Sequence, residues 1–229
     1  VDEANPYFSS LDGVLTDKNR TTIVAYPAGK GKRYIIPDGI TKIGTHSFFA
    51  CPITYIHTPN SVKTIELFAF ASCTDLDTII LGNSVDSIEG AAFRINDRLK
   101  TIYSMNPIPP AAHPEAFSSF SPMFFIQCTL YVPVGSLQAY KNAEVWKNFK
   151  NIVENDFTGI ERPSPDKAKI FGNKNSISFR NIEPGTDISI YDTTGKCIKT
   201  FAVDGDSEIP LPSGIYLIKY AGRTVKIIL

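Results

Sequence analysis

The sequence predicts a mainly β protein in two parts: a solenoid of short repeats over residues 1–156 and a small antiparallel β-sandwich over residues 169–229. Two observations lead to this prediction. Similar segments recur at intervals of 22 and 23 residues through the first two thirds of the chain. After a polar stretch that contains Pro163 and Pro165, alternating apolar and polar runs are bounded by turn residues.

The repeat is visible in three segments, which read YIIPDGITKIGTHSFFAC, IHTPNSVKTIELFAFASC and IILGNSVDSIEGAAFRIN. Three columns coincide in all of them: an isoleucine, a phenylalanine and a small polar residue (Ile43, Ile65, Ile88; Phe48, Phe70, Phe93; Cys51, Cys73, Asn96). A period in the low twenties is typical of a leucine-rich-repeat solenoid, in which each unit contributes a short strand and one turn.

Strand alternation predicts which side chains face the core of this solenoid. Successive residues of a strand point to opposite faces, so the positions one and three before the Pro/Gly column at Pro37, Pro59 and Gly82 point inward. These inward positions hold Tyr34, Ile36, Ile56, Thr58, Ile79, Leu81, Ile102 and Ser104. Coils that stack about 4.8 Å apart place like residues on like, so we expect the phenylalanine column to form an internal stack.

Both ends of a solenoid need a cap, because a terminal coil exposes its apolar edge. Upstream, residues 13–16 and 22–26 flank a turn and predict a β-hairpin laid across the first coil. Downstream, we expect a degenerate repeat at 115–117, a last strand at 129–133 and a short helix from Gly135. The apolar residues that follow, with Trp146 among them, are interpreted as a lid rather than as a ligand site.

Composition excludes several classes of function. Lys and Arg total 23, as do Asp and Glu, so the charge pattern indicates no nucleic-acid partner. The apolar runs are too short for a membrane span. No signal peptide stands at Val1, which fits either a cytosolic chain or an exported one whose signal peptide has been removed. The four cysteines form no CxxC pair, so four unpaired and mostly buried thiols are favoured over a disulfide.

The second part is expected to begin after a linker at residues 157–168. Its predicted strands are 176–179, 188–192, 197–201, 215–220 and 224–229, with a tight hairpin turn around Gly195. Short strands at this spacing, with no helical pattern between them, indicate a small sandwich.

No constellation of residues predicts catalysis, a cofactor or a metal. His57 is expected on the outward face of a strand, whereas Cys51 and Cys73 point inward, which disfavours a Cys-His dyad. The carboxylates of Asp204, Asp206 and Glu208 could offer oxygen ligands to Ca²⁺, but a solvated turn explains them better. We therefore expect a non-enzymatic protein.

The outward strand positions form the candidate binding surface. Two residues before the Pro/Gly column, the chain places Ile35, His57, Ile80, Tyr103 and Tyr131, with Arg33 and Tyr55 at the adjacent outward position. Exposed apolar and aromatic patches tend to mark interaction sites. The alternative is that β-propensity alone accounts for Ile and Tyr there.

Several segments in order resemble the BspA-like leucine-rich-repeat proteins: GVLTDKNRTTIVAYPAGK, IPDGITKIGTHSFFAC, TPNSVKTIELFAFASC, NPIPPAAHPEAF and LYVPVGSLQAYKNAEVWKNFKNIV. The chain departs from that pattern at Gly82, where proline is usual, and at Asn96, where cysteine is usual. The resemblance implies a secreted or surface-anchored protein that acts as an adhesin toward a host or bacterial surface protein or glycan.

The segments DISIYDTTGKCIKTF and LPSGIYLIKYAGRTVKIIL resemble the C-terminal sorting domain of type IX secretion cargo. This resemblance implies contact with the secretion machinery and a location at the cell surface or outer membrane; a purely structural β module is the alternative. The predicted function is thus a surface adhesin. A carbohydrate-binding accessory protein, with Tyr55, Tyr103 and Tyr131 as sugar-stacking platforms, is the other candidate, and the ligand and oligomeric state stay open.

Overall fold

The computed structural model describes residues 1–119, 121–157, 169–173, 175–180, 182, 185–203, 207–220 and 222–229. The chain divides into two compact units, residues 1–158 and 159–229. Each unit has a hydrophobic core of its own. Residues 158–168 of the predicted linker lie outside the described residues.

One side of the first unit is a parallel sheet. Among the described residues it has six strands, in the order β13-β12-β10-β8-β6-β4. Their bounds are Arg33–Ile35 (β4), Tyr55–His57 (β6), Thr78–Leu81 (β8), Thr101–Ser104 (β10), Thr129–Pro133 (β12) and Asn151–Asn155 (β13). Each coil adds one strand in register with the last, which confirms the predicted solenoid.

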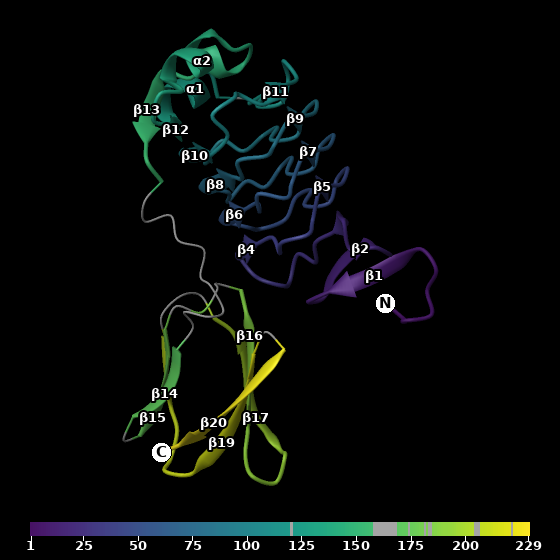
Figure 1. Ribbon diagram of the computed structural model, residues 1–229, viewed down its shortest axis with the longest axis vertical. Helices are drawn as coiled ribbons and strands as arrows, with labels where there is room; N and C mark the ends of the chain where they lie inside the picture. Colours follow the sequence, from purple (N-terminus) through teal and green to yellow (C-terminus); the bar gives the residue numbers. More distant parts are fainter. Residues whose placement is uncertain are drawn as a thin grey trace. The chain divides into compact units, whose positions relative to one another are not determined.

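A second sheet runs along the other side of the coils (Figure 1). Its seven described strands are β1 (Phe8–Leu11), β2 (Val14–Asp17), β3 (Thr22–Ala25), β5 (Lys42–Ile43), β7 (Thr64–Ile65), β9 (Ser87–Ile88) and β11 (Ala111–Ala112). The strands β1 to β3 are antiparallel, and β3 onward is parallel. The isoleucine column of the repeat lies in these short strands.

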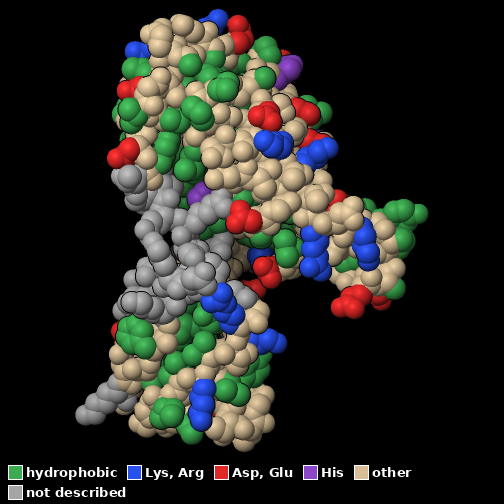
Figure 2. Space-filling model, in the orientation of Figure 1, with side chains coloured by type: hydrophobic (Ala, Val, Ile, Leu, Met, Phe, Trp, Pro, Cys, Tyr) green, Lys and Arg blue, Asp and Glu red, His purple; other side chains and the backbone are tan. Residues whose placement is uncertain are grey.

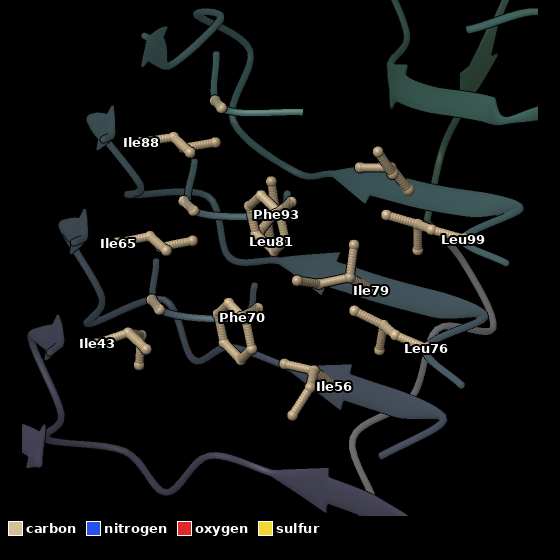
Figure 3. Packing of buried hydrophobic residues seen from close by; sticks show 14 of the residues in the cluster. Ile43, Ile56, Ile65, Phe70, Leu76, Ile79, Leu81, Ile88, Phe93 and Leu99 are labelled. Carbon is tan, nitrogen blue, oxygen red and sulfur yellow. The ribbon is translucent and has the colours of Figure 1, made fainter. Parts of the chain in front are cut away.

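The solenoid core lies between the two sheets. Figure 3 shows the inward isoleucines of both sheets on either side of Phe70 and Phe93. Each residue predicted to face inward is at most 6% exposed. The phenylalanine rings stack from coil to coil, with centroids 4.8 Å apart between Phe48 and Phe70 and 5.3 Å apart between Phe70 and Phe93. The predicted internal stack is therefore confirmed.

Aromatic side chains close both ends of this stack. Tyr26 stacks on Phe48 at 4.9 Å, and Trp146 meets Phe117 edge-on at 5.5 Å. The indole nitrogen of Trp146 donates a hydrogen bond of 2.7 Å to the carbonyl oxygen of Pro110, and its side chain is fully buried. Trp146 thus caps the core, as the sequence predicted. The cap contains α1 (Phe124–Gln127), α2 (Leu137–Asn142) and a 3₁₀ turn, η1 (Trp146–Asn148).

The N-terminal hairpin differs from its prediction in how it caps the first coil. Strands β2 and β3 pair as expected, and Val14 and Ile23 are fully buried. However, β3 pairs in parallel with β5, Thr22 opposite Lys42, so the hairpin extends the second sheet instead of lying across the coil. Pairing within the sheet satisfies the backbone groups of the edge and still covers the core.

Ion pairs link neighbouring coils on the surface. Lys42 Nζ lies 3.1 Å from a Glu66 carboxylate oxygen, and Arg98 Nη1 lies 2.7 Å from Asp75 Oδ1. Figure 2 shows acidic and basic side chains next to one another on the visible face of the solenoid. Exposed pairs of this kind contribute about 0–1 kcal/mol each, so they support the coil register more than the total stability.

The C-terminal unit is an antiparallel β-sandwich. Over its described residues, one sheet has three strands and the other has four. The smaller sheet contains β14 (Lys169–Asn173), β15 (Ser176–Arg180) and β18 (Ser207–Pro210); the larger contains β17 (Cys197–Ala202), β16 (Asp187–Tyr191), β19 (Ile215–Tyr220) and β20 (Arg223–Ile228). Residues from both sheets, including Phe179 and Ile218, share one core. This confirms the predicted fold, although the sequence analysis missed β14 and β18.

Candidate functional site

The outward residues of the six-stranded sheet fall into register across its strands. We call one row of them the outer ladder: Ile35, His57, Ile80, Tyr103, Tyr131 and Val153. None of these side chains belongs to the hydrophobic core cluster, although their strand neighbours do. The ladder therefore lies on the sheet face that points away from the core, as alternation predicted.

The outer ladder is not uniformly exposed. Ile35, His57 and Ile80 are only 8%, 2% and 3% exposed, whereas Val153 is 44% exposed. Ile35 lies on the edge strand β4 and is nevertheless buried, so its burial does not come from neighbours on both sides within the sheet. The exposure predicted for the whole ladder thus fails at Ile35, His57 and Ile80, and the accessible part is at its C-terminal end.

Aromatic contacts organise that C-terminal end. The rings of Tyr103 and Tyr131 stack with centroids 4.7 Å apart, and Phe157 meets Tyr103 edge-on at 6.4 Å. Burial raises the pKa of the Tyr103 hydroxyl, and the neighbouring Tyr131 adds to this rise. Both tyrosines are half-buried, so their stacked rings form a fixed apolar surface beside the exposed Val153.

A second outward row runs beside the ladder. Arg33, Tyr55, Thr78, Thr101, Thr129 and Asn151 occupy it in register. The Arg33 guanidinium lies 4.1 Å from the centroid of the Tyr55 ring, a cation–π contact that covers one face of the tyrosine. Arg33 and Tyr55 are therefore engaged with each other, at a different place along the sheet from Tyr131.

Two members of this surface were missed by sequence reasoning. Val153 comes from β13, which was not predicted as a strand, and Phe157 was assigned to the linker. The signal for Val153 was present, because it follows Tyr131 by 22 residues, one repeat period. Nothing in the repeat pattern indicates that Phe157 contacts Tyr103.

The histidines and carboxylates considered for chemistry lie in different places. His46 stacks on Phe68 at 5.0 Å, and His113 Nδ1 accepts a hydrogen bond from the Glu115 main-chain N–H at 3.2 Å. Within the described part of the chain, no group of three or more His, Cys, Asp or Glu residues is arranged to hold a metal ion. Asp204 and Asp206, which were considered as Ca²⁺ ligands, lie outside the described residues.

The repeat region has a recognisable family. Residues 27–130 match the family model of the BspA type leucine-rich repeat region, in six copies. This region belongs to the BspA-type leucine-rich repeat family. No curated protein matches the chain. No helix among the described residues is long and apolar enough to cross a membrane.

Several solved structures, most of them of leucine-rich repeat proteins, are similar to the chain. The pneumococcal vaccine antigen PcpA is 18% identical with a TM-score of 0.43, over 67% of this chain and 49% of that one. A leucine-rich repeat protein from Bacteroides capillosus is 22% identical with a TM-score of 0.42, over 55% of this chain and 98% of that one. A leucine rich cell surface protein from Faecalibacterium prausnitzii is 17% identical with a TM-score of 0.36, over 67% and 41%. The chain thus spans about half the length of the pneumococcal antigen that it matches.

The BspA-type region has a kind of fold that is typically non-enzymatic. Solenoids of leucine-rich repeats present extended, rigid surfaces, and such folds are typically protein-interaction scaffolds. On the outer face of the six-stranded sheet, aromatic side chains and exposed apolar surface coincide at the C-terminal end of the outer ladder. Tyr103, Tyr131 and Val153 are therefore the candidate contact residues.

Proposed function

We propose that this chain is an exported surface protein whose solenoid binds a protein of a host or of another bacterium. The family match supports the surface location, because the BspA-like proteins that the sequence resembles are mostly secreted or surface-anchored. The observation that carries the binding proposal is the stacked pair Tyr103–Tyr131 beside Val153, which is 44% exposed. Aromatic residues held on a rigid surface are characteristic anchors of protein interfaces.

The same geometry gives less support to the alternative that these tyrosines stack against sugars. A sugar stacks on the free face of an aromatic ring, but the rings of Tyr103 and Tyr131 face each other at an interplanar angle of 16°. One face of Tyr55 is covered by the Arg33 guanidinium. A protein partner can use the edges and hydroxyl groups of these rings, so we favour a protein over a glycan as the ligand.

Binding can be tested with the purified chain and a matched pair of variants. The ladder variant carries Tyr131→Ser and Val153→Ser; the control carries Tyr7→Ser and Val1→Ser, which change more exposed side chains of the same types at the N-terminal end of the chain (Tyr7 74%, Val1 57%). The probes are a panel of immobilised host matrix proteins and whole bacterial cells. We expect the ladder variant to bind at least about tenfold more weakly, which corresponds to about 1.4 kcal/mol, and the control to bind as the parent does.

Equal binding by both variants, with circular dichroism confirming their fold, would place the binding surface elsewhere. If no protein or cell in the panel binds the parent chain, the panel members are excluded as ligands and the adhesin function rests on the family resemblance alone.

For the C-terminal unit we propose a role in secretion or attachment. Support comes from the sequence resemblance to type IX sorting domains and from a core that is separate from that of the solenoid. Deleting residues 169–229 in the organism that makes the protein should leave the remaining chain inside the cell. Unchanged surface display of the shortened chain would contradict this role and favour a purely structural module.

A further inference from the structure

A recess of about 590 Å³ lies on the corner of the coils that follows β7, β9 and β11. Its origin is visible in the repeat. At two successive columns the coil of β7 carries Leu67 and Phe68, while the next coil carries Gly90 and Ala91. The register of β7, β9 and β11 aligns these columns. The coil of β9 therefore lacks the two large side chains that the coil of β7 has. This leaves a gap, one coil wide, between the two neighbouring coils.

The walls and floor of this recess are mostly apolar. Leu67, 40% exposed, and the half-buried Phe68 form one wall, and His113 with Glu115 forms the other. The floor is at Gly90, where an added Cβ would lie 3.3 Å from His113 Nδ1 and 3.4 Å from Leu67 Cδ1. Both walls therefore reach the edge of the glycine, and a larger side chain at this position would have to push them slightly apart and would then occupy the recess.

The charge around the recess is negative. Among the described residues that line it, Glu89 and Glu115 are acidic, and neither Lys nor Arg is present. Glu89 is held in place, because its Oε2 accepts the Leu67 main-chain N–H at 3.1 Å. Arg94 lines a separate recess on the other side of Glu115. The nearby His46 ring stacks on Phe68 and fixes the position of that wall.

We propose that this recess binds a basic side chain, arginine or lysine, of a partner protein. An apolar cleft with carboxylates at its rim matches a side chain that has an apolar stem and a cationic head. The aromatic wall adds a cation–π contact for the head group. This surface lies on the corner beside the second sheet, so it is independent of the outer ladder and goes beyond the function proposed above.

The test uses the full chain and short capped peptides, with NMR detection of the backbone amides of Gly90 and Ala91. The probes are Ala-Ala-Arg-Ala-Ala and the same peptide with Lys, Leu or Glu in the centre. Single side chains bind weakly, so the titration extends to about 10 mM, where a Kd of about 1 mM is nearly saturated. We expect saturable shifts with the Arg and Lys peptides, and binding at least about threefold weaker with Leu and Glu.

Two variants locate the binding. Gly90→Leu gives this coil the residue that the preceding coil has in the same column and fills the recess, so binding should fall by about tenfold or more. Glu89→Gln keeps an acceptor for the Leu67 N–H but removes the charge, so it should weaken the Arg and Lys peptides by a few fold and leave the Leu peptide unchanged. Glu144→Gln, an exposed carboxylate in the cap, is the control and should have no effect.

Absence of saturable shifts at Gly90 and Ala91, equal binding of the Leu or Glu peptide, or binding retained by a folded Gly90→Leu chain would each overturn the proposal. None of these outcomes depends on Tyr131 or Val153, so this proposal and that of the outer ladder can fail separately.

Discussion

The side-chain amide of Asn96 donates a hydrogen bond of 2.9 Å to the main-chain oxygen of Phe70 in the preceding coil. Cys73 makes the equivalent contact, with its Sγ 2.9 Å from the Phe48 oxygen, and Cys51 Sγ lies 3.6 Å from the oxygen of Tyr26. One repeat column therefore supplies a buried donor for a carbonyl of the coil before it. This explains how asparagine can replace cysteine in this buried column, because both side chains can donate to the same carbonyl.

Removing the donor at this column should destabilise the solenoid. Asn96→Ala leaves the Phe70 carbonyl without its partner, so we expect the free energy of unfolding to fall by about 1–3 kcal/mol. Asn96→Cys keeps a donor and removes Asn96 Oδ1, a buried atom with no hydrogen-bond partner in the described structure, so it should cost less. Urea unfolding followed by the fluorescence of Trp146 measures both. Equal losses would show that the donor contributes nothing at this column.

Gly82 is a second departure from the repeat pattern, and the reason for a glycine there is steric. A Cβ at this position would lie 2.3 Å from the main-chain oxygen of Pro59, and the Gly82 N–H donates to Thr58 Oγ1 at 2.9 Å. We expect Gly82→Ala to lower the free energy of unfolding by about 1–3 kcal/mol, since a backbone atom must move. The control is Gly29→Ala, where an added Cβ meets nothing within 4 Å. A fall in stability of the same size in the control would contradict this explanation.

Repeat spacing and strand alternation predicted the solenoid, its stack and its inward residues, because these follow from the periods of the sequence. Alternation states which face of a sheet a side chain occupies, but not what covers that face. His57 and Ile80 are therefore on the predicted face and yet buried. The contact of Phe157 with Tyr103 joins residues that no periodic relation connects. Such contacts depend on tertiary packing, so a single sequence does not reveal them.

The recess at Gly90, by contrast, has a signal in the sequence. Two small residues at columns that hold Leu67 and Phe68 one coil earlier are visible in the aligned repeats. The pattern alone does not say whether neighbouring side chains fill the gap, and the structure supplies that answer. The edge pairing of β3 with β5 is similar, because lying across a coil and extending its sheet both bury the same apolar residues.

Acid should weaken the solenoid partly through Glu66. Burial raises the pKa of this carboxyl, but hydrogen bonds from Lys42 and from the main chain and hydroxyl of Thr45 outweigh it, so the pKa lies below its usual value of 4.5. A depressed pKa in the folded state stabilises the fold above the unfolded value, and that contribution is lost as the pH falls through the folded pKa. Stability should therefore drop as the pH falls below the usual pKa of 4.5.

The variant Glu66→Gln isolates this contribution. It should be less stable than the parent at about pH 6 and should lose less stability on acidification. Thermal unfolding across this pH range measures the difference, with Glu144→Gln as the control on an exposed carboxylate. A parallel pH dependence of Glu66→Gln and the parent would show that Glu66 is not coupled to folding.

The four thiols should differ sharply in reactivity. Burial raises the pKa of Cys73 and of Cys128 to about 12 and also raises that of Cys51, whereas Cys197 is exposed. Because the thiolate is the reactive form, iodoacetamide at about pH 8 should modify Cys197 first in the native chain. Peptide mass spectrometry identifies the modified residues, and Cys197→Ser should abolish the fast reaction. All four thiols should react once denaturant unfolds the chain. Rapid modification of Cys73 in the native chain would contradict this prediction and would mean that its coil opens readily. Two cysteines that resist the reagent after unfolding would reveal a disulfide.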